Sequence, residues 1–170
     1  LDLSVLKNLM DVNFWGTVYC TKYALPYILK TKGSVVGVSS IAGYRGLPGR
    51  TGYWSSKFAM NGFMESLRTE LLKTGVHVMV ACPGFTASNI RVTALAKDGA
   101  SHGETSMEEG KMMSADTVAQ TIADGIIARK RTLIMTGQGK LTVWLNKLFP
   151  ALADKLVFNH FTKEKNALIK

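Results

Sequence analysis

Cysteine is scarce in this sequence of 170 residues: only Cys20 and Cys82 occur, and they lie far apart. Two isolated cysteines form neither a disulfide framework nor the spacing of a zinc site. An oxidising compartment is therefore not implied, and we expect a reduced, cytoplasmic setting. We interpret His77 as a core or interface residue and His102 as a loop residue, and we expect no metal site.

The sequence also lacks a long apolar run. The longest stretch without a charged residue, 74–90, contains Pro83, two glycines and several polar residues, so it is not expected to span a bilayer. No basic segment followed by an apolar one opens the chain, so we expect no signal peptide. The chain begins at Leu1 rather than at a methionine, as an internal part of a longer sequence would.

Acidic residues are few, 12 against 21 basic ones, which gives a net charge of +9. The excess is +3 over residues 1–110 and +6 over residues 111–170. A basic surface can bind nucleic acid, anionic lipid or a phosphorylated cofactor. No nucleic-acid-binding motif is present, so we expect no nucleic acid partner. The 46% share of hydrophobic residues excludes disorder and is enough for one domain with a buried core.

Helical spacing and β-rich runs alternate along the chain. The predicted order is a helix at 4–29, a strand at 34–39, a helix at 53–73, a strand at 76–82, a helix at 114–129, a strand at 132–135 and an amphipathic extension at 140–170 divided by Pro150. This alternation predicts an α/β fold with a parallel sheet, and we expect its first strand to be buried on both faces. Because three strands are too few and the first lacks a partner on one side, we expect the second half of a doubly wound parallel sheet.

Chemistry is expected where the strands end, because open parallel sheets bind ligands at their carboxyl edges. Ser40 and Pro83-Gly84 follow the first and second predicted strands. Tyr53 and Lys57 stand four residues apart at the start of a helix, and therefore on one helical face. An ammonium group near a phenol lowers the pKa of the phenol, which suits a tyrosine acid or base. Alone, such a pair is more often an ordinary surface pair.

The combination of these residues resembles the short-chain dehydrogenase/reductase family, which has an extended Rossmann-type fold. Four motifs match in the family's order, over nearly the whole chain up to about residue 135: Asn13, Ser40, the pair Tyr53 and Lys57, and Pro83-Gly84. The resemblance implies an oxidoreductase that transfers a hydride between NAD or NADP and an alcohol or ketone. The alternative is a truncated, non-catalytic remnant or interaction module that cannot hold a cofactor.

The resemblance also implies a role for each catalytic residue. Tyr53 exchanges a proton with the substrate oxygen, and Ser40 holds that oxygen. Lys57 lowers the pKa of Tyr53 and binds the nicotinamide ribose. Asn13, at a break in its helix, holds a water that links Lys57 to solvent. From the residues alone, Asn13 could be a satisfied polar group, and Ser39 stands beside Ser40 as an equal candidate.

The nicotinamide carboxamide is expected to bind along Pro83, Gly84, Phe85, Thr86 and Ser88, where Ser88 replaces a threonine common in the family. The family's glycine-rich pyrophosphate turn and its Asn-Asn-Ala-Gly run are absent, so the chain keeps the catalytic half. The residue that separates NAD from NADP is absent as well.

Three further expectations concern the surroundings of the site. Residues 85–113, with Met107, Met112 and Met113, match the family's substrate loop and suggest an apolar lid and an apolar substrate. A surface insertion without such a role is the alternative. We expect the extension at 140–170 to pack over the substrate mouth or another subunit, with peripheral membrane contact as the less favoured alternative. The helices at 4–29 and 53–73 resemble the family's dimer bundle, so we expect a homodimer or tetramer.

Overall fold

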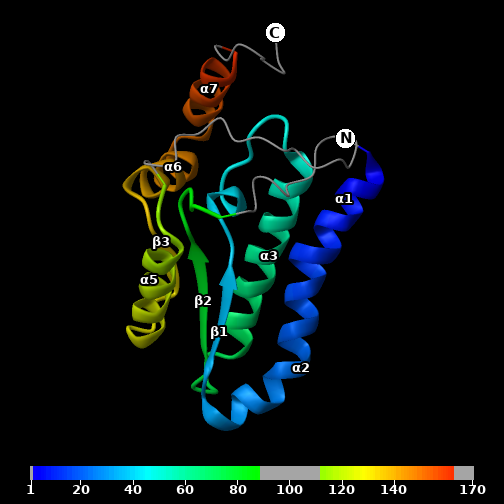
Figure 1. Ribbon diagram of the computed structural model, residues 1–170, viewed down its shortest axis with the longest axis vertical. Helices are drawn as coiled ribbons and strands as arrows, with labels where there is room; N and C mark the ends of the chain where they lie inside the picture. The colour runs from blue at the N-terminus through cyan, green and yellow to red at the C-terminus, as the bar shows by residue number, and fades with distance from the viewer. Residues whose placement is uncertain (1, 89–111, 163–170) are drawn as a thin grey trace.

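A computed structural model describes residues 2–88 and 112–162 of the chain (Figure 1). Three strands alternate with helices in the predicted order. In chain order the elements are α1 (Leu3–Met10), a π-helical turn η1 (Asp11–Trp15), α2 (Gly16–Thr31), β1 (Ser34–Val38), a 3-10 turn η2 (Ile41–Gly43), α3 (Thr51–Glu70), β2 (His77–Cys82), α5 (Ala115–Ile127), β3 (Thr132–Ile134), α6 (Gly137–Leu148) and α7 (Pro150–Phe161).

The three strands form one parallel sheet in the order β1-β2-β3. Ser34 pairs with His77 and Val38 with Ala81, while Val80 pairs with Thr132. The prediction of a parallel α/β sheet is therefore confirmed. Within the described residues β1 has a partner on one side only, as expected for part of a larger doubly wound sheet.

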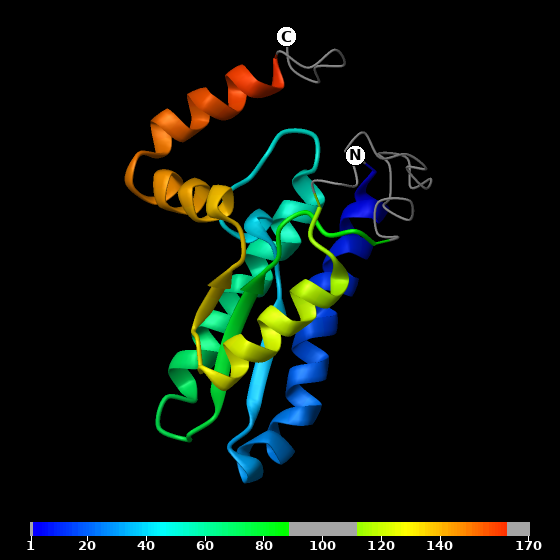
Figure 2. The ribbon, with the colours of Figure 1, turned by 60° about the vertical axis from the view of Figure 1, so that its left-hand side comes forward.

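Helices cover both faces of the sheet (Figures 1 and 2). One face of β2 carries Val78, Val80 and Cys82, which are buried in a cluster with the inner side of α3. On the opposite face, Gly125 lets α5 approach closely: a Cβ atom there would lie 3.2 Å from the sulfur of Met79. The side chains of β2 thus alternate between two helical layers, as a buried parallel strand requires.

The prediction that the first strand is buried on both faces is wrong in this structure. Val38 is 48% exposed, whereas all six residues of β2 are buried. The difference follows from position, because β1 lies at the edge of the sheet and α5 packs over Met79 and Leu133 of the other two strands. The exposed strand edge is the side on which additional strands could pair.

The C-terminal part of the described chain folds into the two helices that Pro150 was expected to separate. Pro150 is the first residue of α7, where its missing amide hydrogen costs no helical hydrogen bond. The helix before it begins at Gly137, three residues earlier than predicted. None of the helices in residues 2–88 and 112–162 is long and apolar enough to cross a membrane.

Candidate active site

Two elements bring Ser40 and Tyr53 to the carboxyl edge of the sheet. Ser40 follows β1 in an extended conformation, and its hydroxyl caps η2 by accepting a hydrogen bond from the amide of Ala42 at 3.2 Å. Tyr53 lies in the first turn of α3, and its phenol is close enough to the side chain of Ser40 for that side chain to lower its pKa. The two hydroxyl groups thus lie near one another at this edge, as the predicted chemistry requires.

The structure also distinguishes Ser40 from its neighbour Ser39 as the candidate site residue. The hydroxyl of Ser39 is buried and has no hydrogen-bond partner, and Ser39 is 6% exposed. Ser40 is half-buried and meets Tyr53. Of the two serines, only Ser40 acts on the pKa of the candidate acid.

The environment of Tyr53 differs from the expectation. Burial raises the pKa of Tyr53 above its ordinary value of 10.0, and the hydrogen bond with Ser40 and the charge of Arg50 lower that pKa by smaller amounts. Desolvation wins because a phenolate is costly to place in a partly apolar site. The phenol is thus protonated at neutral pH, which is the form that can donate a proton.

Lys57 lies one turn along α3 from Tyr53 and is only 8% exposed. Its ammonium nitrogen donates a hydrogen bond to the carbonyl of Val38 at 3.1 Å and lies 5.8 Å from the centre of the Tyr53 ring. Burial lowers the pKa of Lys57, and the charge of Cys82 raises it less. The expected lowering of the Tyr53 pKa by Lys57 is not found here, because burial governs both groups and Lys57 is directed to Val38.

Asn13 occupies the π-helical turn between α1 and α2, so the expected break in its helix is present. Its side-chain amide donates to the hydroxyl of Ser56 at 3.1 Å, and Ser56 in turn donates to the backbone carbonyl of Tyr53 at 2.7 Å. Asn13 is therefore joined to the helix that carries Tyr53. A π-turn of this kind often marks a functional site, because one extra residue redirects the neighbouring groups.

The segment after β2 lies beside the end of β3 and the start of α6. A Cβ atom on Gly84 would lie 2.4 Å from the methyl carbon of Thr136, so a glycine is required there for packing. The hydroxyl of Thr86 donates to the carbonyl of Gly84 at 3.1 Å. Pro83 is half-buried, whereas Phe85 and Ser88 are exposed. These five residues follow β2 at the same edge of the sheet at which Ser40 follows β1, and are called the rim.

Both described ends of the predicted substrate loop meet at this rim. The amide of Ala87 donates to Met113 at 2.9 Å, and the amide of Met113 donates to Phe85 at 2.8 Å. Residues 89–111, including Met107, lie outside the described residues. Met112 and Met113 are half-buried where the chain returns to α5.

Sequence reasoning missed three groups of this site. Ser56 is fully buried between Asn13 and Tyr53, and the carbonyl of Val38 receives Lys57. Cys82 is buried at the end of β2, where burial raises the pKa of its thiol to about 12 and the charge of Lys57 lowers that pKa less. Ser56 could have been found from the sequence, because it directly precedes Lys57. Nothing in the sequence pattern pointed to the carbonyl of Val38 or to the thiol of Cys82.

The donor set suits the nicotinamide end of a dinucleotide rather than a metal. Among residues 2–88 and 112–162 no group of three or more His, Cys, Asp or Glu side chains could hold a metal ion. Lys57 and Tyr53 offer donors for ribose hydroxyls, and residues 83–88 offer backbone groups and the hydroxyls of Thr86 and Ser88. These residues fit a nicotinamide nucleotide, whereas a glycine-rich pyrophosphate turn is absent from the 170 residues.

Comparison with known protein families supports this reading. The family model described as short chain dehydrogenase matches residues 1–99. A mouse protein, "Dehydrogenase/reductase SDR family member 7B", is 30% identical over 97% of this chain and 52% of its own length. A Drosophila melanogaster protein, "Dehydrogenase/reductase SDR family protein 7-like", is 32% identical over 98% of this chain and 51% of its own length. The chain spans about half the length of the curated relatives it matches.

Solved structures share the fold. A short-chain dehydrogenase from Burkholderia cenocepacia in complex with NADP has a TM-score of 0.70 at 19% identity, over 91% of this chain and 60% of that protein. Acetoin dehydrogenase from Enterobacter cloacae has a TM-score of 0.65 at 18% identity, over 83% of this chain and 57% of that protein. At these identities the likeness establishes the Rossmann-type architecture.

Proposed function

Because this chain belongs to the short-chain dehydrogenase family, we propose that it carries the acid–base centre of an NAD(P)-dependent oxidoreductase acting on an alcohol or ketone. The observation that carries the proposal is the proximity of the Ser40 and Tyr53 side chains at the carboxyl edge of the sheet, with Lys57 bound to the end of β1. Lys57, buried one helical turn away, completes the group. Relatives named as dehydrogenase/reductases support the reaction class.

In the reductive direction the two hydroxyl groups bind the carbonyl oxygen of the substrate. Ser40 holds this oxygen, and Tyr53 donates its proton to it as the carbonyl carbon is reduced. The raised pKa of Tyr53 keeps the phenol protonated before the transfer. In the oxidative direction the same oxygen of Tyr53 takes the proton from the alcohol.

Lys57 and Asn13 assist this proton transfer without contacting the substrate oxygen. We propose that, once Tyr53 has lost its proton, the charge of Arg50 and that of Lys57, whose ammonium lies 5.8 Å from the centre of the Tyr53 ring, stabilise the phenolate. Asn13 and Ser56 hold the backbone of Tyr53 in place. We propose that Asn13 also holds the water through which Lys57 exchanges protons with solvent.

The nicotinamide cofactor, when bound, supplies or accepts the hydride. Lys57 and Tyr53 would hold its ribose, and Pro83, Gly84, Phe85, Thr86 and Ser88 its carboxamide. Either NAD or NADP is compatible with these residues. We propose that strands carrying the glycine-rich turn pair with the open edge of β1, since the chain spans about half of its relatives.

Two features support the proposed apolar substrate and the proposed oligomer. The sulfur of Met113 lies 3.5 Å from a Cβ atom built on Gly84, and the half-buried Met112 precedes it, which favours an apolar substrate. Trp15 at the end of η1 and Tyr19, Tyr23 and Tyr27 of α2 recur every four residues and are 42–72% exposed. An exposed aromatic stripe of this kind favours a homodimer or tetramer formed through α2 and α3.

The second candidate is a remnant or interaction module without catalytic activity, and the missing pyrophosphate turn favours it. Nicotinamide fluorescence of NADH and NADPH titrated with the purified chain distinguishes the two, after its intact mass has been measured. Saturable binding, together with reduction of a panel of ketones, supports the oxidoreductase. A folded chain that binds neither nucleotide supports the module.

A further inference from the structure

The helices α6 and α7 form a hairpin at the end of the molecule where β1 ends and α3 begins (Figures 1 and 2). Close packing begins next to the site: a Cβ atom on Gly139 would lie 2.7 Å from the Ile41 side chain, one residue after Ser40. The start of α6 thus packs against the segment that follows Ser40 at the carboxyl edge of the sheet.

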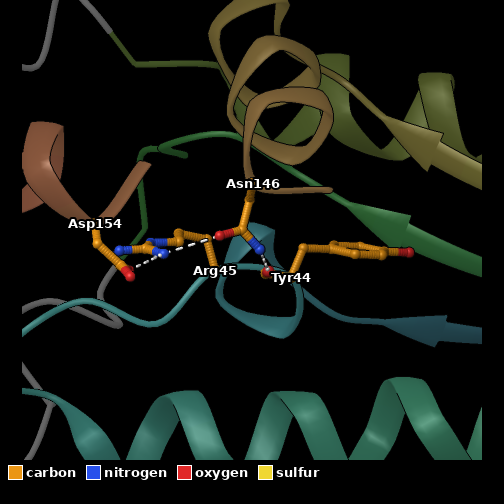
Figure 3. A network of polar contacts seen from close by, with 4 residues as sticks. All are labelled: Tyr44, Arg45, Asn146 and Asp154. Carbon is orange, nitrogen blue, oxygen red and sulfur yellow. Dashed lines mark hydrogen bonds and ion pairs between the residues drawn. The ribbon is translucent and has the colours of Figure 1, made fainter. Parts of the chain in front are cut away.

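A polar network fastens the hairpin there (Figure 3). Arg45 donates to the side-chain oxygen of Asn146 at 2.9 Å and forms an ion pair with Asp154 at 2.8 Å. Asn146 donates in turn to the carbonyl of Tyr44 at 2.9 Å. One arginine from the loop after η2 therefore contacts both helices.

The hairpin presents large apolar side chains to the outside. Leu141, Trp144 and Leu148 follow a helical three- and four-residue spacing and so share one side of α6. Trp144 contacts Phe149 edge to face at 5.9 Å, which continues this surface into α7. The exposed apolar surface, 47–61% exposed residue by residue, comprises Leu141, Trp144, Leu148, Phe149, Leu152 and Leu156.

Lysines border this surface. Lys140 and Lys147 are seven residues apart, so they lie on the same flank of α6, and Lys155 lies between Leu152 and Leu156 in α7. All three are exposed. In residues 137–162 the single acidic residue is Asp154, which is already paired with Arg45. The hairpin is therefore apolar at its centre and positively charged at its margin.

We propose that the outer face of α6 and α7 binds the surface of an anionic lipid membrane. Trp144, Phe149 and the leucines enter the boundary between headgroups and acyl chains, and the three lysines contact the anionic headgroups. Contact along the surface agrees with the absence of a membrane-crossing helix in the described residues. This reverses the preference drawn from the sequence, because in the structure these side chains do not close over the protein.

Charge argues against a second copy of this chain as the occupant. A two-fold contact brings the same patch of both copies together. The lysines at its margin would then face lysines, while the carboxylate of Asp154 is engaged by Arg45. An anionic bilayer neutralises the same lysines instead.

The proposal has a consequence for substrate access, which rests on the proposed function. A membrane bound at α6 and α7 lies at the end of the molecule where β1 ends and α3 begins, the elements that supply Ser40 and Tyr53. The substrate class that this arrangement serves is a membrane-dissolved alcohol or ketone. Vesicle binding itself requires neither cofactor nor activity, so it can be tested apart from the proposed reaction.

The test is co-sedimentation of the purified protein with vesicles of phosphatidylcholine, alone or mixed with phosphatidylserine. We expect binding to the mixed vesicles only, weakened by salt. Replacing Lys140, Lys147 and Lys155 by glutamine weakens it about tenfold or more. The matched control replaces Lys7, Lys22 and Lys73, which are exposed elsewhere, and leaves binding close to that of the wild type.

The apolar contribution is tested in the same way. Leu141→Gln, Leu148→Gln and Leu156→Gln together abolish binding, whereas Leu3→Gln, Leu72→Gln and Ile127→Gln, at still more exposed sites elsewhere, retain it. Tryptophan emission shifts to the blue on binding, and Trp144→Phe removes most of this shift while binding persists. The last variant makes a mild change and keeps the test open if the triple variants fail to fold.

Several results overturn the proposal. Failure of the wild type to sediment with either vesicle contradicts it, as does a control set that loses as much binding as its test set. Equal binding to both vesicle compositions also contradicts it, because the lysines then contribute nothing. Conversion of an oligomer to a monomer by the α6 and α7 variants, measured by sedimentation velocity, assigns the surface to a second copy instead.

Discussion

The ammonium group of Lys57 donates a hydrogen bond to the carbonyl oxygen of Val38, 3.1 Å away, at the last residue of β1. Lys57 belongs to the helix that carries Tyr53, and Val38 to the strand that leads to Ser40. This one bond therefore joins the two elements that supply the acid–base pair. It also provides a buried cation with an acceptor in place of water.

Replacing Tyr53 by phenylalanine removes the proton donor and keeps the ring. We expect kcat/KM for ketone reduction to fall about 10²–10⁴-fold, the usual contribution of a positioned acid or base. Tyr44→Phe is the matched control, since Tyr44 also lies near the end of β1 but faces Thr132 rather than Ser40. Equal losses in both variants, measured in steady-state assays, would show that Tyr53 is not the acid.

The thiol of Cys82 predicts a loss of stability at alkaline pH. Burial raises its pKa from 9.0 to about 12 in the folded protein. A raised pKa means that the stabilisation is complete below pH 9, where both states hold the proton, and is lost as the pH rises toward 12 and the unfolded state ionises first. The loss by pH 12 is about 4 kcal/mol from this group.

Urea unfolding from pH 8 upward measures this effect. We expect the free energy of unfolding of Cys82→Ala to decline less steeply between pH 9 and pH 12 than that of the wild type. Cys20→Ala is the control, because Cys20 is exposed on α2 and its replacement should preserve the steep decline. Parallel curves for the wild type and Cys82→Ala contradict the assignment to this thiol.

Much of the architecture could be predicted from the sequence, because periodicity reports which side of an element is buried. The alternation of strands and helices predicted the parallel sheet, and its carboxyl edge predicted that Ser40 and Tyr53 would meet. The exposed face of β1 could not be predicted, since burial of Val38 depends on which neighbours α5 covers. The residues of β1 themselves contain no information on which strands α5 covers.

The electrostatics of the site were harder to predict for the same reason. A spacing of four residues between Tyr53 and Lys57 indicates one helical face, but not how far either group is removed from water. In the structure burial raises the pKa of Tyr53 and lowers that of Lys57. Each group therefore keeps its neutral form over a wider pH range than it would in water. The bond from Lys57 to Val38 spans 19 residues of sequence and leaves no local signal.

Gly84→Ala is expected to destabilise the fold for a specific steric reason. The new Cβ atom meets the methyl carbon of Thr136 at 2.4 Å, so the turn before α6 must shift, at a cost of about 1–3 kcal/mol. Thr136→Ser removes that methyl and keeps the hydroxyl that caps α6 through Gly139. The double variant should therefore regain part of the loss in thermal unfolding experiments.

Gly62→Ala is the matched control for this substitution. No atom lies within 4 Å of a Cβ built on Gly62, which stands in the middle of α3. Alanine there should stabilise the protein by about 1 kcal/mol, because it lowers the backbone entropy lost in a helix. If Gly84→Ala and Gly84→Ala/Thr136→Ser are equally unstable, the clash with Thr136 is not the cause.

The aromatic stripe of α2 gives the last prediction, which concerns assembly. Trp15 stacks on Tyr19 at 5.6 Å, and beyond them Tyr23 and Tyr27 are about 70% exposed. If the proposed dimer buries this stripe, Tyr23→Glu with Tyr27→Glu places two carboxylates in an apolar contact and shifts the protein to monomers in sedimentation velocity experiments. Ile127→Glu, an equally exposed change at the end of α5, should leave the oligomer intact. A wild-type monomer at every concentration, or an oligomer that survives both changes, would exclude α2 as the contact, because buried aromatic side chains cannot accept two unpaired charges without losing affinity.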